Sequence, residues 1–245
     1  TSGPRVLYII QSRSEQAGRA WNKMRKEAPW SFVERYYLDN LEEINSPESK
    51  FYLSFLKNIK GKKILCLGCG PNLYDDAFFY GDIPKELVGI DINKNNMEFL
   101  KKSKNLQLIK YKNFLIRNGV KVKLIVGDIF KPKKEFIGKF DCVYSIGVIT
   151  NFKENKFKKL LDIIYSYLKP NSIFLSIDWT EDYLSEKKYK ERLSYGWYLR
   201  VNYDTKDVEQ LIENSGFNMI KHEVYNVPNP KEYLWGKIHG YLAIK

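Results

Sequence analysis

The chain has 245 residues, of which 44% are hydrophobic and 29% are charged. These shares are typical of a globular protein, and they exclude collagen, coiled coil and disorder as descriptions of the whole chain. No apolar stretch approaches the roughly 20 residues that span a bilayer, and the short apolar run near the start lacks a signal-peptide cleavage site. We therefore expect a cytoplasmic protein with no membrane segment, and its oligomeric state is not predicted.

Charge is the largest departure from an average composition, because 41 lysines and arginines against 29 acidic residues give a formal net charge of +12. Such a surplus favours anionic partners, either a nucleic acid or a phosphorylated or carboxylated small molecule. The lysines are spread along the chain without a long unbroken block, so they are also compatible with an ordinary solvated surface. Charge alone leaves these alternatives open.

Three cysteines, an odd number, do not make a disulfide framework. Cys66 and Cys69 form a Cys-x-x-Cys pair, but zinc needs about four ligands, and no further pair of Cys or His stands at ligand spacing. A redox pair is expected to open a helix, whereas Cys66 lies within an apolar, strand-like run. We expect neither a metal site nor a redox role.

The first sixty residues are typical of helices. Apolar residues recur at steps of three and four between Trp30 and Ile44, and Ser46-Pro47 reads as the start of another helix that ends at Gly61. We expect residues 1–60 to form an N-terminal helical cap and residues 61–245 to form the main domain.

Beyond Gly61, short runs of Ile, Val and Leu alternate with polar or helical stretches. Continuous apolar runs of this length are typical of strands that are buried on both faces of a parallel sheet. The runs are 64–67, 87–92, 123–126, 141–146 and 173–177.

Two connecting segments carry clear helix signals. One runs from Lys153 to Leu168, with Asn151 and Glu154 as a capping pair and Lys169-Pro170 as its stop, and another covers 206–215 with Gly216 as its C-terminal cap. Strands that alternate with helices predict a doubly wound α/β sheet.

The tail departs from this rhythm. Residues 217–227 and 238–244 read as two strands joined by a loop too short for a helix, so we expect them to pair antiparallel. The prediction is a seven-stranded sheet with an antiparallel last strand.

The strongest chemical signal is the segment 64–72, in which a strand ends in Gly68-Cys69-Gly70. Glycines permit a tight turn and a close approach of the backbone to a ligand. Twenty-one residues after Gly70, Asp91 ends the second strand, where a carboxylate can accept hydrogen bonds from both hydroxyls of a ribose. Asp128 and Ser145 stand at the ends of the next two strands.

Each feature has a simpler explanation, since the glycines can form a plain turn and Asp91 and Asp128 can cap helices. Their order and spacing together favour a nucleoside site at the carboxyl edge of the sheet. Leu73 occupies the place of the third glycine of the dinucleotide fingerprint, and the phosphate-loop pattern is absent.

On these residues, the chain resembles the class I S-adenosylmethionine-dependent methyltransferases over about residues 60–245. The resemblance implies a Rossmann-like fold, S-adenosyl-L-methionine as cofactor and S-adenosyl-L-homocysteine as product. The residues that it implies around the cofactor, together with one tyrosine of the helical cap, are Gly68, Cys69, Gly70, Asn72, Asp91, Ile92, Asp128, Ile129, Ser145 and Tyr37.

The chain departs from the family pattern at two positions. Cys66 replaces the acid that often precedes the glycine loop, and Asn72 replaces a common third loop glycine. The first helix after the loop, within 73–81, is also unusually aromatic and acidic.

Methyl transfer from a sulfonium requires alignment and exclusion of water, and it needs a general base only when the acceptor holds a proton that solvent does not take. Asp178, near the end of the fifth strand, is our first candidate, with a helix cap as the alternative. His222 is the second candidate, with a structural hydrogen bond as the alternative, and His239 is not assigned a role.

An insertion at about 180–204 is rich in aromatic residues, and we expect it to act as a lid over the acceptor. Aromatic faces can stack on a substrate and arginines can clamp a phosphate or carboxylate, although each aromatic residue can equally belong to the lid's own core. The candidate substrate-binding residues are Trp179, Tyr183, Tyr195, Trp197 and Arg200.

Three functions fit this sequence. The first is an O- or N-methyltransferase that acts on a small, anionic metabolite, sugar or natural-product precursor. The second is a methyltransferase of RNA or another nucleic acid, which the charge favours but the fourth strand does not, because 144–147 lack the Asn- or Asp-Pro-Pro-aromatic pattern of enzymes that act on a flipped base. The third is a binding protein without activity, which the intact Asp91 and glycine loop disfavour.

Overall fold

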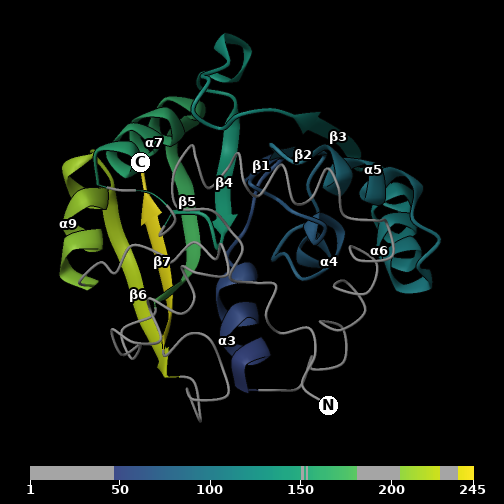
Figure 1. Ribbon diagram of the computed structural model, residues 1–245, viewed down its shortest axis with the longest axis horizontal. Coiled ribbons are helices and arrows are strands. Elements are labelled where there is room, and N and C mark those ends of the chain that lie inside the picture. Colours follow the sequence, from purple (N-terminus) through teal and green to yellow (C-terminus); the bar gives the residue numbers. More distant parts are fainter. Residues whose placement is uncertain (1–46, 150–151, 153, 181–204, 227–236) are drawn as a thin grey trace, which may run out of the picture.

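The computed structural model describes residues 47–149, 152, 154–180, 205–226 and 237–245. One mixed sheet runs through the middle of these residues in the order β3-β2-β1-β4-β5-β7-β6 (Figure 1). Its strands are β1 (Lys63–Leu67), β2 (Glu86–Asp91), β3 (Lys121–Val126), β4 (Phe140–Ile146), β5 (Leu168–Thr180), β6 (Asn218–Asn226) and β7 (Lys237–Ile244).

The first five strands are parallel, and β7 lies antiparallel between β5 and β6. This confirms the predicted seven-stranded, Rossmann-like sheet with its antiparallel last strand. The strand order reverses between β1 and β4, and open α/β sheets bind ligands at the carboxyl edge beside such a reversal.

Helices cover both faces of the sheet, in the arrangement that Figure 1 shows. The first face carries α3 (Pro47–Leu56), α4 (Leu73–Phe78), α5 (Lys94–Lys102) and α6 (Leu106–Arg117). The opposite face carries α7 (Glu154–Tyr167), α9 (Thr205–Asn214) and the short 3₁₀ helix η2 (Lys134–Phe136). The fold therefore has three layers, with a hydrophobic cluster on each side of the sheet.

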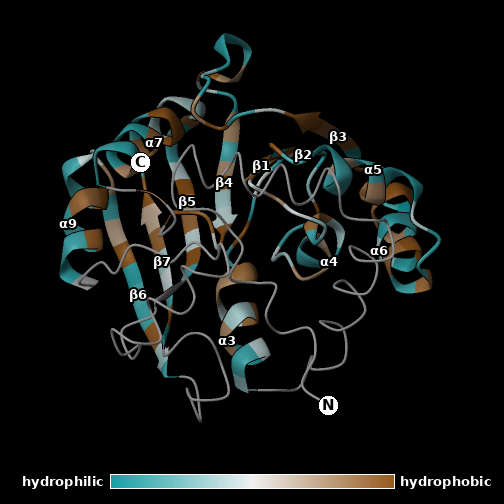
Figure 2. Ribbon diagram, in the orientation of Figure 1, coloured by the Kyte–Doolittle hydropathy of each residue, from teal (hydrophilic) through white to brown (hydrophobic). Residues whose placement is uncertain are grey.

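Residues on the inner faces of α7 and α9 explain why these segments are helical. Phe157, Leu160 and Leu161 are fully buried on α7, and Val208 and Ile212 are buried on α9. The spacing of three and four residues places each set on one side of its helix. Figure 2 shows that α9 carries both hydrophobic and hydrophilic bands. Both predicted helices are confirmed to within one residue at each end.

Helix α3 packs closely against β7. Phe55 is fully buried, and a Cβ atom added to Gly240 would lie 2.3 Å from its ring, so only glycine fits at that position. The helix ends at Leu56, earlier than the predicted end before Gly61. The two ends differ because Lys57 and Asn58 form a turn, which still buries Ile59.

One expectation about strands is wrong. β3 is not buried on both faces, because it is the edge strand, and Val126 is 51% exposed. Helix α7 ends at Tyr167, just before Lys169-Pro170, in agreement with the predicted stop. β5 begins directly at Leu168, earlier than the predicted run 173–177, and its register with β4 shifts between Phe140 and Cys142, near Asn171 with its positive φ of 59°.

No helix among the described residues is long and apolar enough to cross a membrane.

Candidate active site

The glycine loop joins β1 to α4 at the carboxyl edge of the sheet. Gly68 and Gly70 have φ angles of 62° and 54°, a region that glycine adopts without strain. The Cys69 N–H donates a hydrogen bond to the carbonyl oxygen of Ile90 at 3.1 Å, which ties the loop to β2. A Cβ atom added to Gly70 would meet nothing within 4 Å, so this residue borders open space. The loop thus presents bare backbone at the point where the sheet order reverses.

Asp91, the last residue of β2, holds this edge together. Its side chain is only 7% exposed, Oδ2 accepts a hydrogen bond from the Gly70 N–H at 2.8 Å, and Oδ1 accepts one from the Asn93 N–H at 2.7 Å. A carboxylate offers about four lone-pair sites, which is more than these two hydrogen bonds use. Asp91 therefore occupies the place that the ribose-binding prediction requires, and it also fixes the two loops on either side of it.

The residues after Asp91 continue the same edge. Asn93 caps α5, because its Oδ1 accepts a hydrogen bond from the Asn95 N–H at 2.9 Å. Ile92 stands between Asp91 and Asn93 and is 44% exposed, which is unusual for a large aliphatic side chain so close to the core. An exposed apolar side chain beside a carboxylate suits a ligand with one flat apolar part and one hydroxylated part.

Three buried side-chain atoms of the described residues lack a hydrogen-bond partner, and all three lie in the segments that follow β1 and β2. They are Asn72 Oδ1, Asp75 Oδ1 and Asn93 Nδ2. Buried polar atoms are mostly paired in folded proteins, so these three are candidates for contact with a polar ligand. Asn72 is also the residue before α4, yet its side chain makes no capping hydrogen bond.

A second polar cluster lies beneath the loop, on the α4 side of the sheet. The Tyr80 hydroxyl donates a hydrogen bond to the Tyr144 hydroxyl at 2.6 Å, and the Tyr144 hydroxyl donates one to Asp76 Oδ2 at 3.3 Å. Burial raises the pKa of Asp76 to about 7, and burial beside Asp76 also raises the pKa of Asp75. The unusual acidic and aromatic composition of 73–81 was the sequence signal for this cluster, although its contact with Tyr144 was not predicted.

The cysteines belong to the core. Cys66, Cys69 and Cys142 are free and buried, and desolvation raises the pKa of each thiol. Thiols in this state are poor nucleophiles and poor metal ligands at neutral pH. No group of three metal-ligating side chains occurs among the described residues. The Cys69 side chain thus lies among core residues, and its N–H is already bonded to β2.

Asp128 and Ile129 lie just beyond the end of β3. Asp128 Oδ1 accepts a hydrogen bond from the Phe130 N–H at 2.9 Å, so this carboxylate stabilises its own turn. Ile129 is partly buried against the hydrophobic cluster beneath α7. The structure places both residues at the predicted edge, on the strand next to β2.

Asp178 is fully buried near the end of β5. Ser176 Oγ donates a hydrogen bond to Asp178 Oδ2 and lies 3.1 Å from Ser145 Oγ, also fully buried. In the sheet register, Ser176 pairs with Ser145, and Ser145 pairs with Leu67, the last residue of β1. Asp178 is two residues further along β5, level with the glycine loop. Sequence reasoning found Asp178 and Ser145 but missed Ser176, which links them.

His222 lies in β6, at the far side of β7 from Asp178. Its Nδ1 is 2.8 Å from Glu209 Oε1 of α9, and its Nε2 is 3.4 Å from Nδ1 of His239. His239 is the residue of β7 that pairs with Asp178. His239 therefore stands between His222 and Asp178 in the sheet, and no role was predicted for it from the sequence.

The remaining candidates cannot be placed in the same way. Tyr37, Tyr183, Tyr195, Trp197 and Arg200 lie outside the described residues. Trp179 belongs to β5, where its backbone pairs with Ile238.

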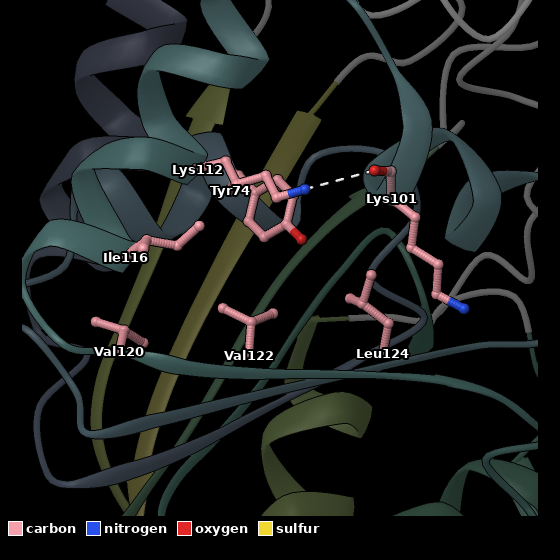
Figure 3. A pocket seen from close by; sticks show the side chains of 7 residues that line it. All are labelled: Tyr74, Lys101, Lys112, Ile116, Val120, Val122 and Leu124. Carbon is pink, nitrogen blue, oxygen red and sulfur yellow. Dashed lines mark hydrogen bonds between the residues drawn. The ribbon is translucent and has the colours of Figure 1, made fainter.

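A separate cavity of about 340 Å³ lies away from this edge, between α4, α6 and β3. Figure 3 shows Val120, Val122 and Leu124 in a row along one side, and Lys112 above them, with Nζ 3.4 Å from the Lys101 carbonyl oxygen. The residues that line it are Tyr74, Lys101, Lys112, Ile116, Val120, Val122 and Leu124. None of them was predicted to bind a ligand.

Solved structures share this architecture. One is the phosphoethanolamine N-methyltransferase 2 of Haemonchus contortus, which was solved with phosphomonomethylethanolamine and S-adenosylhomocysteine. It is 18% identical with a TM-score of 0.59, and the alignment covers 90% of this chain but only 58% of the Haemonchus chain. Another is the N-methyltransferase NodS of Bradyrhizobium japonicum, solved with S-adenosylhomocysteine, which is 12% identical with a TM-score of 0.56, and the alignment covers 88% of this chain and 97% of NodS. The chain thus spans less than two thirds of the Haemonchus enzyme.

The fold by itself does not determine the chemistry. SpnF, a [4+2]-cyclase, is 12% identical with a TM-score of 0.55, and the alignment covers 81% of this chain and 79% of SpnF. No curated protein sequence matches the chain. The amino-acid sequence does match a family described as a methyltransferase domain over residues 30–222, which is most of its length. The chain therefore belongs to the methyltransferase-domain family, as its glycine loop and Asp91 predict, and its fold is that of the S-adenosylmethionine-dependent enzymes.

Proposed function

We propose that this chain transfers a methyl group from S-adenosyl-L-methionine to an oxygen or nitrogen atom of a small, anionic metabolite. The observation that carries the proposal is the Asp91 carboxylate, which bridges Gly70 and Asn93 at the carboxyl edge of the sheet. The family match supports methyl transfer, and the net charge of +12 supports an anionic acceptor.

The residues at this edge fit an adenosyl group. Gly70 leaves room for a close approach, Asp91 retains acceptor sites for ribose hydroxyls, and Ile92 offers an exposed apolar side for a base. The unpaired Asn72 Oδ1 is a further acceptor in the adjoining loop, suited to the ammonium or hydroxyl of the same ligand. The donor set is entirely oxygen and backbone, as expected for an organic ligand rather than a transition metal.

When bound, S-adenosyl-L-methionine supplies a methyl group that its sulfonium already makes electrophilic. The work of this chain is then to hold the donor at the Gly68–Gly70 loop, to align the acceptor above β4 and β5, and to exclude water. Asp178 stands level with the loop and accepts a hydrogen bond from Ser176, which fixes its carboxylate for taking a proton from the acceptor.

The class of acceptor is inferred from charge and from relatives. One solved relative binds a phosphorylated amine, and another is described as an N-methyltransferase. Arg200 and the aromatic residues of 180–204 remain our candidates for holding such an acceptor, by a guanidinium fork and by stacking.

The test has two arms. Isothermal titration should detect binding of S-adenosyl-L-methionine by the purified protein, and incubation with a methyl-labelled donor and a metabolite extract should yield a labelled small product, identified by mass spectrometry. Failure to bind the donor would reject the proposal. Label that enters RNA instead of small molecules, with an affinity for RNA that falls steeply with salt, would favour the nucleic-acid alternative.

A further inference from the structure

Three ionisable side chains from different elements form a continuous chain on the α7–α9 side of the sheet. Glu209 Oε1 of α9 lies 2.8 Å from His222 Nδ1 of β6, and His222 Nε2 lies 3.4 Å from His239 Nδ1 of β7. The Glu209 side chain is 36% exposed, the His222 side chain 13%, and His239 only 3%. This series of three side chains therefore runs from the solvent-exposed surface into the interior.

His239, the innermost of the three side chains, lies beside the strand that carries Asp178. His239 pairs with Asp178 in the antiparallel register of β5 and β7, and residues paired in this way project on the same face. Asp178 in turn lies two residues beyond Ser176, level with the glycine loop. The series of contacts from Glu209 thus reaches His239, which pairs with Asp178, the residue that we propose to take the acceptor's proton.

The two imidazoles lie in a stack of nearly parallel rings. The ring of Tyr241 stacks on that of His222 at 4.6 Å between centroids with an interplanar angle of 5°, and the rings of His222 and His239 are inclined by only 7°. Tyr241 is buried, and burial together with the negative charges of Asp178 and Glu209 raises the pKa of its hydroxyl. Tyr241 thus stacks beside His222 in the same set of nearly parallel rings that includes His239.

Within the part of the chain that the structure describes, three elements bring titratable groups near the imidazoles. Glu209 faces them from α9, Asp178 from β5 and Tyr241 from β7, while the residue of β6 that pairs with His239 is the apolar Val224. The neighbours of His222 along β6, Lys221 and Glu223, pair with each other at 3.0 Å. They belong to the opposite face, because side chains alternate along a strand.

We propose that Glu209, His222 and His239 form a proton relay that serves Asp178 during methyl transfer; this inference rests on the proposed function. As the bond between the methyl carbon and sulfur breaks and the bond to the acceptor's oxygen or nitrogen forms, sulfur keeps the electron pair and the acceptor releases one proton to Asp178. Asp178 passes this proton to His239 Nε2 while His239 gives its Nδ1 proton to His222 Nε2, and His222 gives its Nδ1 proton to Glu209, which releases it to solvent. Each imidazole is left with its proton on Nε2, and rotation of the rings restores the Nδ1–H forms before the next turnover.

The carboxylate at the outer end also sets the direction of the relay. A Glu209 carboxylate accepts the His222 Nδ1–H, which leaves His222 Nε2 as the acceptor for the Nδ1–H of His239. Both imidazoles then adopt one tautomer each. Glu209 and His222 are positioning residues in this scheme, because they act on the acceptor only through His239 and Asp178.

The experiment exploits the fact that the chain has only two histidines. In protein without a histidine tag, the imidazole signals are followed by NMR against pH in the presence of S-adenosyl-L-homocysteine, and His222→Gln assigns them. Glu209→Gln is the test variant, and Glu213→Gln, an exposed glutamate one turn further along α9, is the matched control. The pH dependence of kcat is measured on the same proteins.

We expect Glu209→Gln to lower kcat near neutral pH about 10- to 100-fold with KM nearly unchanged, because an amide cannot take the proton that His222 Nδ1 releases. The imidazole signals of His222 should change as well, because the ring loses its anionic partner. Glu209→Asp should restore part of this loss, and Glu213→Gln should change neither readout.

Two negative outcomes are distinguishable. An active wild-type enzyme whose histidine titrations and kcat profile are both unchanged by Glu209→Gln overturns the relay and leaves the proposed function intact. A wild-type protein that binds the donor but transfers no methyl group to any acceptor rejects the proposed function, and independent titrations of the two histidines in that protein reject the relay as well.

Discussion

The backbone N–H of Gly70 donates a hydrogen bond to the Asp91 carboxylate at 2.8 Å, which joins the end of β1 to the end of β2. The two residues were predicted to face a ligand from separate strands, and the structure shows that they also contact each other. A change at Asp91 is therefore expected to act twice, once on the ligand and once on the shape of the glycine loop.

Asp91→Ala should weaken binding of S-adenosyl-L-methionine by about 1–3 kcal/mol, because ligand hydroxyls and the Gly70 N–H both lose a charged acceptor. Isothermal titration measures the affinity, and the thermal midpoint separates this loss from unfolding. Asp162→Ala, which removes an exposed carboxylate of α7, is the control and should bind the donor normally. Equal affinities of Asp91→Ala and the wild type would remove Asp91 from the cofactor site.

Gly70→Ala should abolish donor binding while costing only modest stability. The added methyl group has a free space in the chain itself, so the folding cost is the strain of a positive φ, on the order of 1–2 kcal/mol. Gly119→Ala is a matched control, since Gly119 also has a positive φ, of 74°, with nothing within 4 Å of its added Cβ. The two variants should unfold at similar temperatures, and only Gly70→Ala should lose the donor; retained binding would place the ligand elsewhere.

The sheet could be predicted from the sequence because its signals are local. Buried strands are short apolar runs, and α7 and α9 repeat apolar residues at helical spacing, so their ends agree with the observed ones within one residue. α5 and α6 are not among the predicted helices. Lysines and asparagines dominate α5, whereas α6 is rich in apolar residues on more than one side, and three of them, Leu108, Tyr111 and Leu115, are buried. β3 was wrongly expected to be buried on both faces. It is the edge strand, and the order of strands in a sheet cannot be inferred from local sequence.

The candidate site could be predicted only where its parts follow strand ends. Asp91 and Asp178 follow from that rule, because parallel strands bring their carboxyl ends to one edge. The contact between His222 and His239 depends on the register of β6 against β7, and the link from Ser176 to Asp178 depends on side-chain geometry. The spacing of residues in the sequence predicts neither of these contacts, so both were missed.

Asp76 should make the stability of the protein depend on pH near neutrality. Burial raises its pKa from 3.8 to about 7, so the folded state binds this proton more tightly than the unfolded state does. Stability should therefore fall as the pH rises from 3.8 to about 7 and stay level above that, where the buried carboxylate is charged in both states. The raised pKa of Asp75 contributes in the same direction.

Asp76→Asn should flatten this dependence, because an uncharged amide can still accept the hydrogen bond from the Tyr144 hydroxyl. Thermal midpoints measured between pH 5 and pH 8 test this, with the largest gain in the variant expected at the higher pH. Asp82→Asn, at an exposed site, serves as the control and should follow the wild type. A wild-type midpoint that rises across this range would contradict the prediction.

Gly240→Ala should destabilise the packing of α3 on the sheet. The added Cβ would lie 2.3 Å from the Phe55 ring, and overpacking of a core typically costs about 1–3 kcal/mol. Phe55→Ala should be destabilising by itself, but the double variant should lose less than the sum, since the smaller side chain removes the clash. Denaturant titration measures all three, and additive losses would mean that the two positions do not touch.

Asp178→Asn tests the proton acceptor directly. The amide oxygen can still accept the hydrogen bond from Ser176, so the fold and the affinity for S-adenosyl-L-methionine should remain, whereas an amide cannot take a proton from the acceptor. We expect kcat to fall about 10²- to 10⁴-fold, the range typical of a lost general base, with little change in donor affinity. Asp207→Asn, at an exposed carboxylate of α9, is the matched control. An unchanged kcat would mean that the acceptor sheds its proton without Asp178, and a loss of donor binding would assign this carboxylate to the cofactor instead of the acceptor.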